Sequence, residues 1–393
     1  MKRLLVLAAA TAVSAGTGLG TAALAAPSQS GITHRNVRVC ATPTTIGVAA
    51  CNAIRHDTLR DGKPVSPGAT GTPSGYGPSA LHAAYNLPST PTSGTPTIAI
   101  VDAYDLPTAL NDVNVYRSQY GLGNPLVNGT SFRQVGQTGG PVPAVNASWG
   151  QEIALDIEMA TAICNTCNIL LVEATSASLS DLATAVNYAA SQPGVVAISN
   201  SYGGSETSAN SAYNQTAKGI AVTVSTGDSG YGVQSPASYP YVTAVGGTSL
   251  TSSGGTYSET AWSGAGSGCS RYTAQQPWQT GVVKNCSNRA LADVSAVADP
   301  NTGVAVYDST AYQGSVGWMV FGGTSVAAPI IGAVYALANN GGGTSMPYTH
   351  QSSLHDVTTG RNGHCNRTPA LCTAGTGWDG PTGLGTPNGL GAF

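Results

Sequence analysis

Short apolar runs of strand length alternate with segments of helical periodicity from Thr95 onward, and this alternation constrains the fold more than any other feature. The runs, such as Thr97-Ile-Ala-Ile-Val101, are continuously apolar, as expected of strands that are buried on both faces. Helices between such strands are typical of a parallel sheet that is covered on both sides. We therefore predict one α/β domain at residues 74–393, in which helices flank a mostly parallel sheet.

Seven apolar runs are predicted to be strands, at residues 97–101, 169–173, 195–200, 220–225, 242–245, 304–307 and 318–321. Four segments are predicted to be helices, at residues 108–120, 150–163, 179–191 and 325–338. Glycine-rich stretches at residues 203–211 and 251–268 are expected to be loops between these elements.

Charged residues make up 8% of the chain, against about 25% in a typical soluble domain. Few carboxylates leave few ion pairs to lose on protonation, which would favour stability in acid. A secreted composition rich in Gly, Ser and Thr explains the low charge equally well. The formal net charge of −3 gives no reason to expect nucleic acid as a partner.

The N-terminus has the pattern of a signal peptide. Lys2 and Arg3 precede an apolar run at residues 4–13, and the small residues Ala23-Leu-Ala25 suit a signal-peptidase site. Gly and Thr interrupt the run well short of the ~20 apolar residues that a membrane span needs. We therefore predict a signal peptide at residues 1–26, a secreted, extracellular protein and no membrane association.

Residues 27–73 differ in composition from the rest of the chain. They carry most of the early charge and lead into a stretch rich in Pro, Gly, Ser and Thr at residues 64–76. Because such a piece is small to fold unaided, we predict a short pro-segment and cleavable linker at residues 27–73. In the alternative interpretation, the segment stays attached as an N-terminal extension of the domain.

Eight cysteines in an exported chain indicate disulfide bonds, because an oxidising compartment favours them. Proximity in the sequence suggests four local pairs: Cys40 with Cys51, Cys164 with Cys167, Cys269 with Cys286, and Cys365 with Cys372. About 105 pairings are formally possible, so this assignment depends on proximity alone. Cys164-Asn-Thr-Cys167 has the spacing of a redox or zinc motif, but a position after a helix disfavours the redox function.

The segment Glu152-Ile-Ala-Leu-Asp156 places two carboxyl groups on one face of a predicted helix. Ser148-Trp-Gly-Gln151 matches a capping box that would begin this helix. If the face is buried, repulsion would make the two carboxyls share a proton and would raise one pKa. If the face is solvated, the pair is only an acidic patch near the positive end of the helix dipole.

A second motif, Phe321-Gly-Gly-Thr-Ser325, runs from a predicted strand through glycines into a helix that begins at or near Ser325. Backbone N–H groups at such a start can face a nucleophile and an oxyanion, although the same pattern is often only a turn and an N-cap. A serine nucleophile needs a base, and none of the six histidines lies in a His-Gly-Thr setting. The sequence therefore gives no support to a histidine-based triad.

These motifs together resemble those of the sedolisin, or serine-carboxyl, peptidase family, relatives of subtilisin in which glutamate and aspartate replace histidine and its partner. The resemblance covers roughly residues 74–390. The matching segments are Glu152-Ile-Ala-Leu-Asp156, Ser225-Thr-Gly-Asp-Ser-Gly230, Gly323-Thr-Ser-Val-Ala-Ala-Pro329, His355-Asp-Val-Thr-Thr-Gly-Arg-Asn-Gly363 and Ala374-Gly-Thr-Gly-Trp-Asp-Gly-Pro-Thr-Gly-Leu-Gly385. The resemblance implies a subtilisin-like three-layer α/β fold, with a mostly parallel sheet of about seven strands, and proteolysis in acid.

By resemblance, Ser325 is the nucleophile and Glu152 is the general base and later the general acid. Asp156 would orient Glu152 and share its proton, and Asp228 would donate to the oxyanion. Carboxyl groups with pKa values near about 4 can act as bases in acid, where histidine is already protonated. Asp228 must hold a proton in order to donate, which low pH and burial favour. Without the resemblance, Asp228 would be interpreted as a turn residue.

The resemblance also implies one structural Ca²⁺ ion in the C-terminal tail. Its ligands would be the carboxylates of Asp356 and Asp379 and the backbone carbonyls of Val357, Gly375 and Gly377. The tail offers oxygen ligands without suitably placed thiols or imidazoles, which favours a hard cation. In the alternative interpretation, the loop holds no metal and is fixed by a bridge between Cys365 and Cys372.

The chain departs from the family pattern in its N-terminal segment and at two single positions. Only 47 residues lie between the expected signal cleavage and the domain, where members usually carry a large pro-domain. Tyr202 stands where the family typically has tryptophan, and Asp102 stands where some members have glutamate. These substitutions keep a hydrogen-bonding group and can alter the surroundings of the site without abolishing catalysis.

We predict an acid-active serine endopeptidase that acts on protein or peptide substrates, has its own pro-segment as a partner and is a monomer by default. The short pro-segment suggests an alternative, a non-catalytic member of the same fold that binds peptides or a surface partner. A glycosidase that uses Glu152 and Asp156 is chemically conceivable, but it leaves Ser325 and Asp228 without roles.

Overall fold

The computed structural model describes residues 31–65, 71–339 and 341–393. The chain divides into a unit of residues 1–31 and a unit of residues 32–393, and the fold is that of the second unit. The predicted signal peptide and part of the predicted linker lie outside the described residues. Within the described residues, no helix combines the length and the apolar character needed to cross a membrane.

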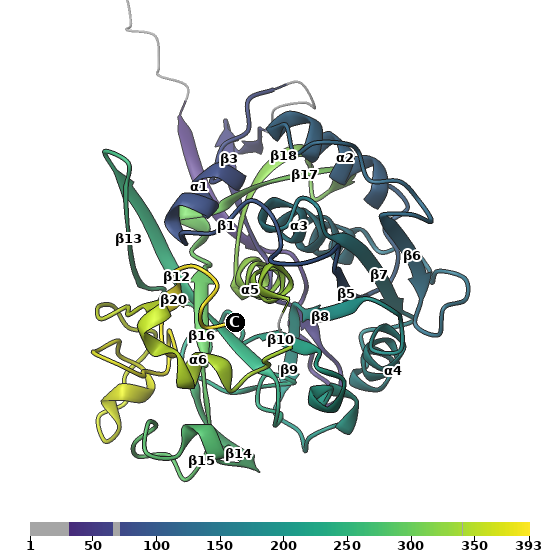
Figure 1. The fold of residues 1–393 in the computed structure, drawn as a ribbon. Helices are drawn as coiled ribbons and strands as arrows, with labels where there is room; N and C mark the ends of the chain where they lie inside the picture. The colour runs from purple at the N-terminus through teal and green to yellow at the C-terminus, as the bar shows by residue number, and fades with distance from the viewer. Residues whose placement is uncertain (1–30, 66–70, 340) are drawn as a thin grey trace, which may run out of the picture. The chain divides into compact units, whose positions relative to one another are not determined.

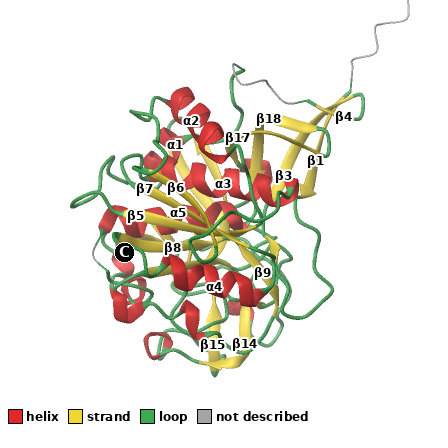
Figure 2. Cartoon of the chain, turned by 90° about the vertical axis from the view of Figure 1, so that its right-hand side faces the viewer, coloured by secondary structure: helices red, strands yellow, loops and turns green. Residues whose placement is uncertain are grey.

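A mostly parallel sheet forms the centre of the fold and has eight strands in the described part of the chain (Figures 1 and 2). Its strands are β5 (Thr97–Ala103), β6 (Phe132–Gly136), β7 (Asn168–Ala174), β8 (Val195–Asn200), β10 (Ala221–Ser225), β12 (Thr243–Ser253), β13 (Thr256–Ala261) and β16 (Val294–Val297). The strand order is β13-β12-β10-β8-β5-β7-β6, with β16 also paired to β12. Only the β12–β13 pair is antiparallel among these neighbours in the described residues, so the predicted fold class is confirmed.

Helices cover both faces of this sheet, as the alternation of strands and helices predicts. The predicted helices are present as α2 (Ala109–Tyr120), α3 (Ala147–Ile163), α4 (Leu179–Ala189) and α5 (Thr324–Ala338). Figure 1 shows α3 and α5 on one face of β5 and β8, and α4 on the other face. Two short helices, α1 (Pro78–Ala84) and α6 (Met346–Thr349), lie outside this layer arrangement.

A second sheet corrects part of the strand prediction. The predicted strands at residues 304–307 and 318–321 form β17 (Val304–Tyr312) and β18 (Ser315–Gly322), but these strands lie outside the parallel sheet. They pair antiparallel with each other, because the two-residue connection Gln313-Gly314 is far too short for the crossover that parallel strands require. Apolar content alone therefore located the strands correctly and gave the wrong partners.

Residues from the predicted pro-segment complete this second sheet. The strand β3 (Ile54–Arg60) pairs antiparallel with β18, and β1 (Ile32–Arg38) pairs with β3 over seven residues. A short strand, β4 (Lys63–Pro64), also pairs with β3. Arg55 of β3 is fully buried and forms an ion pair with Asp57. The segment at residues 32–64 is therefore part of the same folded unit as the strands that precede α5.

The remaining strands form three small sheets in the described residues. Their members are β2 (Ala50–Cys51), β9 (Tyr202–Ser205) and β11 (Gln234–Ser235), then β14 (Gly268–Ala274) with β15 (Asn288–Leu291), and β19 (Leu354–His355) with β20 (Thr386–Pro387). All eight cysteines lie in the described residues and form the four predicted disulfide bonds. Disulfides of this number are typical of an oxidising compartment.

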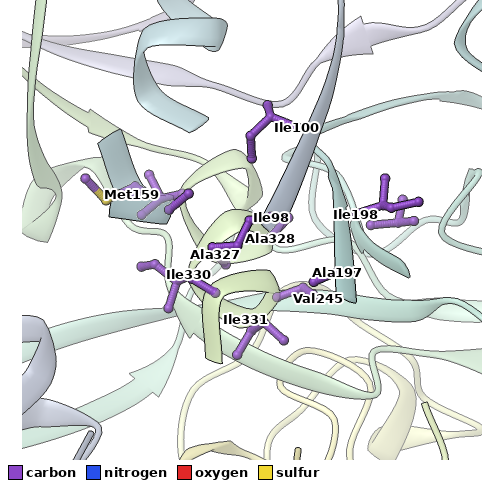
Figure 3. Close-up of a cluster of buried hydrophobic side chains, with 14 of the residues drawn as sticks. Ile98, Ile100, Met159, Ala197, Ile198, Val245, Ala327, Ala328, Ile330 and Ile331 are labelled. Carbon is purple, nitrogen blue, oxygen red and sulfur yellow. The ribbon is translucent and has the colours of Figure 1, made fainter. Parts of the chain in front are cut away.

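The hydrophobic core packs α5 tightly against the parallel sheet. Figure 3 shows Ala327, Ala328 and Ile331 of α5 beside side chains of the sheet strands β5, β8 and β12. Every residue of α5 is buried, and its small side chains let the helix approach closely: the Thr223 hydroxyl donates to the carbonyl oxygen of Ala328 at 3.0 Å. The first turn of α5 is therefore held in one position relative to the strand ends.

Candidate active site

Ser325 is the second residue of α5, so the helix begins within one residue of the predicted start. Gly323 precedes it as the N-cap with a φ of 96°, a left-handed conformation that turns β18 directly into the helix. The Ser325 side chain is fully buried, and its hydroxyl donates to the carbonyl oxygen of Ser201 at 3.0 Å. Its backbone N–H donates to the carbonyl oxygen of Asn52 at 3.0 Å.

Glu152 and Asp156 both lie on α3, but the predicted capping box is wrong. The N-cap is Asn146, whose side-chain oxygen accepts hydrogen bonds from the N–H groups of Ser148 and Trp149 at 3.1 and 3.3 Å. An asparagine with an extended backbone caps a helix N-terminus as well as a serine does. The helix therefore begins earlier than predicted. Glu152 and Asp156 have no exposed surface, which excludes the solvated acidic patch.

Three buried carboxyls act on one another in this region. Burial raises the pKa of Glu152 far above its usual range, and Asp156 and then Asp102 raise it further. Burial and then Asp102 likewise raise the pKa of Asp156. The pKa of Asp102 itself rises to about 8 through burial. None of the three carboxyls has a well-formed hydrogen bond among the described residues, so they are held largely protonated in acid.

Ser325 and Glu152 are close neighbours. The Ser325 hydroxyl lies near enough to lower the pKa of Glu152 as a hydrogen-bond donor, against the larger effects of burial and the nearby carboxyls. The best-formed hydrogen bond of the Ser325 hydroxyl is nevertheless the one to Ser201. Neither Glu152 oxygen is close enough and well enough aligned to form a hydrogen bond within the described residues. The site therefore brings together a serine and a carboxyl that could accept its proton after a small rotation of the hydroxyl.

Asp228 follows β10 and faces the first turn of α5. One oxygen, Oδ1, accepts from the N–H and the hydroxyl of Thr324 at 2.8 and 2.9 Å. The other oxygen, Oδ2, has no hydrogen-bond partner among the described residues. Burial raises the pKa of Asp228 to about 7, against the lowering effects of Thr324 and Arg38. In acid the carboxyl is therefore protonated, and Oδ2 is available as a donor.

Gly323 leaves space in which two donors meet one oxygen. A Cβ atom at this position would lie 2.1 Å from the Asn52 carbonyl oxygen and 2.6 Å from Asp228 Oδ2. The same carbonyl oxygen accepts from the Ser325 N–H. The Ser325 N–H and Asp228 Oδ2 therefore flank a single point, which is the arrangement expected of a site that stabilises an oxyanion.

We expect Gly323→Ala to lower kcat/KM by at least about 100-fold, because the new methyl group fills the point between the two donors. Gly343→Ala is the matched control, since Gly343 also has a positive φ of 64° but has open space around it. Both variants place an alanine at a positive φ, so peptide hydrolysis by the two chains compares such an alanine with and without loss of the oxyanion position. Equal losses in both would contradict the assignment.

Two residues of this site, Ser201 and Asn52, were not predicted from the sequence. Ser201 carries the carbonyl that accepts from the Ser325 hydroxyl, and only its neighbour Tyr202 stood out as a substitution. Tyr202 is buried and donates to Asn200 at 2.7 Å, so it keeps a hydrogen bond at that position. Asn52 lies in the predicted pro-segment, and nothing in its local sequence signals that it contacts residues that far away along the chain.

The predicted calcium ligands lie in one loop region near the C-terminus. Asp356 accepts from the Gly377 N–H at 2.8 Å, and Asp379 accepts from the Gly375 N–H at 3.0 Å. Burial raises the pKa of Asp379 to about 7, and Asp356 acts in the same direction, so the two carboxyls are neighbours. Within the described residues, no cluster of three or more His, Cys, Asp and Glu side chains suits a metal. Any cation here would therefore depend on two carboxylates together with backbone carbonyls such as that of Val357.

Comparisons with known proteins find relatives of this chain in one family. A model of the subtilase family matches residues 144–367. The chain is 32% identical to kumamolisin of Bacillus sp. (strain MN-32) and 29% identical to sedolisin of Pseudomonas sp. (strain 101), over 81% of its length in each case. It spans 63% and 60% of the length of these two relatives. A structure of Pseudomonas sedolisin, a serine-carboxyl proteinase in complex with pseudo-iodotyrostatin, matches with a TM-score of 0.66 and 27% identity, over 81% of this chain and 96% of that one.

Proposed function

Because the chain belongs to the subtilase family and is similar to sedolisin and kumamolisin over four fifths of its length, we propose that it is a secreted, acid-active serine-carboxyl endopeptidase. The observation that carries the proposal is the convergence of Ser325, Glu152 and Asp228 on one buried point. A peptide-binding protein would have no need of two buried carboxyls beside a serine hydroxyl. The substrates are proteins or peptides.

Ser325 and Glu152 carry out the covalent chemistry in this proposal. Ser325 Oγ attacks the carbonyl carbon of the substrate, and Glu152 accepts the hydroxyl proton in the form of the site in which Glu152 is ionised and its neighbours Asp156 and Asp102 hold the shared protons. Glu152 then gives that proton to the leaving amine, which leaves an acyl ester on Ser325 that water hydrolyses. Asp156 and Asp102, which both act on the pKa of Glu152, hold Glu152 in place and share its protons.

Asp228 and the Ser325 N–H stabilise the oxyanion. The negative charge develops where two donors already point, so no reorganisation is needed at the moment of reaction. The Thr324 N–H and hydroxyl hold Oδ1 of Asp228, which fixes the direction of Oδ2. Because Asp228 donates only while it is protonated, the site requires a pH below the pKa of this carboxyl, about 7.

We expect Asp228→Asn to change the pH dependence rather than to abolish activity. In the unmodified chain, kcat/KM falls as the pH rises through about 7, because Asp228 loses its proton. The carboxamide of asparagine has the same shape and donates at every pH, so the variant should keep its rate above pH 7. The measurement is peptide hydrolysis from pH 3 to pH 8 by both chains. The same decline above pH 7 in both would contradict the role of Asp228.

We also propose that the C-terminal loop binds one structural Ca²⁺ ion. Asp356 and Asp379 would supply carboxylate oxygens, and Val357, Gly375 and Gly377 would supply carbonyl oxygens. The support is that two neighbouring carboxyls, one of them buried, have no cationic side chain as an ion-pair partner in the described residues. A hard divalent cation would neutralise them.

Calcium removal tests this proposal through stability. We expect the melting temperature to fall by several degrees in a chelator and to recover with Ca²⁺ but not with Mg²⁺, which tolerates irregular oxygen ligands poorly. Asp356→Ala should melt at one temperature in both conditions. A chain that melts at the same temperature with Ca²⁺ and with chelator would contradict the calcium site and leave the proposed peptidase activity untouched.

A further inference from the structure

Residues 226–232 form the loop that carries Asp228, and we call this segment the oxyanion loop. Thr324 holds one oxygen of the Asp228 carboxyl, but the position of the other oxygen also depends on the backbone of the loop. A catalytic group that is displaced by about 1 Å can lose about 100-fold in rate. The residues that fix the backbone of the oxyanion loop therefore affect the rate of the proposed reaction.

A second loop, residues 264–267, lies against the oxyanion loop, and we call it the strap. Three backbone hydrogen bonds join the two loops, from the Gly266 N–H to the Gly227 carbonyl oxygen at 2.7 Å, from the Gly230 N–H to the Gly264 carbonyl oxygen at 2.8 Å, and from the Gly232 N–H to the Ser267 carbonyl oxygen at 2.8 Å. The first bond lies before Asp228 in the chain and the other two lie after it. The close approach requires Gly266, because a Cβ atom there would lie 2.0 Å from the Thr226 carbonyl oxygen.

Asn362, from the tail motif at residues 355–363, contacts both loops. Its side-chain amide nitrogen donates to the Ala265 carbonyl oxygen at 2.6 Å and to the Ser267 hydroxyl at 2.8 Å. Its backbone carbonyl oxygen accepts from the Tyr231 N–H at 2.9 Å. Asn362 is only 6% exposed, so these hydrogen bonds are shielded from competing water. One residue therefore connects the strap to the end of the oxyanion loop.

The C-terminal tail anchors Asn362 and the strap together. The Asn362 N–H donates to the Cys372 carbonyl oxygen at 3.0 Å, and the Ser267 hydroxyl donates to the Leu371 carbonyl oxygen at 2.6 Å. The disulfide between Cys365 and Cys372 closes the tail segment that returns to Asn362. The strap and the tail thus form one support behind the oxyanion loop.

The hydrogen bonds around Asn362 require a side chain that donates twice. The Ser267 hydroxyl already donates to Leu371, so it can only accept from Asn362, and the Ala265 carbonyl can only accept as well. The other side-chain atom of Asn362, Oδ1, has no partner among the described residues, so the two donated bonds orient the carboxamide. An aliphatic side chain would leave the Ala265 carbonyl oxygen without this donor.

We propose that Asn362 is a positioning residue of the active site, which holds the strap against the oxyanion loop and so directs Asp228 Oδ2 at the oxyanion. This proposal rests on the proposed peptidase function. Asn362 does not touch the reacting atoms and acts through Asp228. The tail motif therefore contributes to the rate of hydrolysis, in addition to the calcium ligands proposed at Asp356 and Val357.

The first experiment compares two asparagine substitutions. Asn362→Ala should lower kcat for peptide hydrolysis at pH 4 by at least about 10-fold, because the strap and the oxyanion loop lose their common support. Asn114→Ala is the matched control, since the Asn114 carboxamide of α2 also holds a loop, through hydrogen bonds to the N–H and the carbonyl of Leu126. The control should change kcat by less than about 2-fold. Equal losses in both variants, or no loss in Asn362→Ala, would overturn the proposal.

A double-mutant cycle with Asp228→Ala separates positioning from a general loss of structure. If Asn362 acts through Asp228, Asn362→Ala should lower kcat at least about 10-fold in the unmodified chain and less than about 3-fold in Asp228→Ala. A merely structural role would lower kcat by the same factor in both backgrounds. The same factor in both would therefore refute the assignment of Asn362 as a positioning residue.

A glycine substitution moves the strap while Asn362 stays unchanged. Gly266→Ala places a methyl group against the Thr226 carbonyl oxygen and should push the strap away from the oxyanion loop. We expect kcat to fall at least about 10-fold. Gly140→Ala is the control, because open space surrounds Gly140, and it should leave kcat unchanged. A folded Gly266→Ala chain with an unchanged kcat would count against the strap.

Hydrogen exchange tests the positioning without any catalysis. In Asn362→Ala, the amides of residues 230–232 should exchange at least about 10-fold faster than in the unmodified chain, whereas in Asn114→Ala they should not change. Unchanged exchange at residues 230–232 in Asn362→Ala would overturn the proposal even if the peptidase function stands. If the unmodified chain hydrolyses no peptide, the peptidase function fails, and faster exchange in Asn362→Ala would still support the role of Asn362 in holding the oxyanion loop.

Discussion

Ser325→Ala is expected to lower peptide hydrolysis by at least about 1,000-fold, the largest effect that we predict for a single substitution, because no other group of the site replaces the attacking oxygen. The structural cost is small. The hydroxyl makes one well-formed hydrogen bond, to Ser201, and losing it costs about 1 kcal/mol. The variant should therefore fold, keep its melting temperature within a few degrees and be inactive.

The measurement is cleavage of denatured globin from pH 2.5 to pH 8, together with thermal unfolding of the same samples. Ser252→Ala is the matched control, since Ser252 is an exposed serine of β12 that lies away from the site. Acid cleavage that persists in Ser325→Ala would remove Ser325 as the nucleophile. A folded chain that shows no cleavage at any pH would instead favour the non-catalytic peptide-binding protein.

The free energy of unfolding is expected to fall steeply as the pH rises from about 4 to about 8. Burial raises the pKa of Asp102 and of Glu173 to about 8 and that of Asp308 to about 7, whereas carboxyls in the unfolded chain titrate near 4. A folded state with raised pKa values binds protons more tightly than the unfolded state. Its stabilisation is therefore complete below pH 4 and is lost as the pH rises through 7 to 8.

The size of this effect is large compared with the stability of a domain. A pKa that rises from 3.8 to about 8 corresponds to roughly 6 kcal/mol for Asp102 alone, against a typical net stability of about 5–15 kcal/mol. Thermal unfolding at intervals from pH 3 to pH 8 should show a melting temperature that falls by more than about 10 °C across the range. A melting temperature that rises toward neutral pH would contradict this prediction.

Asp308→Asn isolates one contribution away from the active site. Asp308 Oδ1 accepts from the Thr310 N–H at 2.7 Å, and an asparagine oxygen can accept in the same way. The other oxygen of Asp308 has no partner among the described residues. The variant should therefore lose part of the decline between about pH 4 and about pH 7, while its stability below about pH 4 changes little. Asp181→Asn is the control, because Asp181 lies in the first turn of α4, where its backbone N–H donates to the N-cap Ser178, away from Asp308.

The buried carboxyls explain the low fraction of charged residues in another way than a shortage of ion pairs or a composition rich in Gly, Ser and Thr. The low charge of the sequence suggested stability in acid, because a chain with few carboxylates has few ion pairs to lose on protonation. The structure shows that several of its few carboxylates are themselves buried, including Glu158, whose pKa burial also raises. Acid is thus favourable for this fold, since protonation removes a cost of burial. Burial of a particular carboxyl depends on tertiary packing, which composition does not report.

The fold could be predicted from the sequence where each element carries its own signal. Runs such as Val195–Asn200 are apolar throughout, so both their strand conformation and their burial follow locally. The sheet to which a strand belongs cannot be predicted from the strand's own residues. For β17 and β18, the two-residue link between them determines that they pair antiparallel, whatever their apolar content. The N-cap of α3 was mispredicted because Asn146 and Ser148 are both good capping residues and only geometry decides between them.

The site could be predicted only in part for a related reason. Glu152 and Asp156 share one helix, and Ser325 lies at a glycine-marked helix start, so sequence spacing sufficed. Asn52 contacts Ser325 although the two residues are 273 positions apart in the sequence. No local sequence pattern encodes such a contact. The pairing of β3 with β18 is what brings this segment to α5.

The pairing of β1 with β3 affects how an added peptide competes for the cleft with the N-terminal segment. Its seven residue pairs join the chain on both sides of Asn52, so the segment whose carbonyl contacts Ser325 is tethered beside the site. A tethered segment has an effective concentration on the order of millimolar at its own binding site, whatever the protein concentration. Dilution would therefore not empty the cleft, and an added peptide must compete with a segment of the same chain.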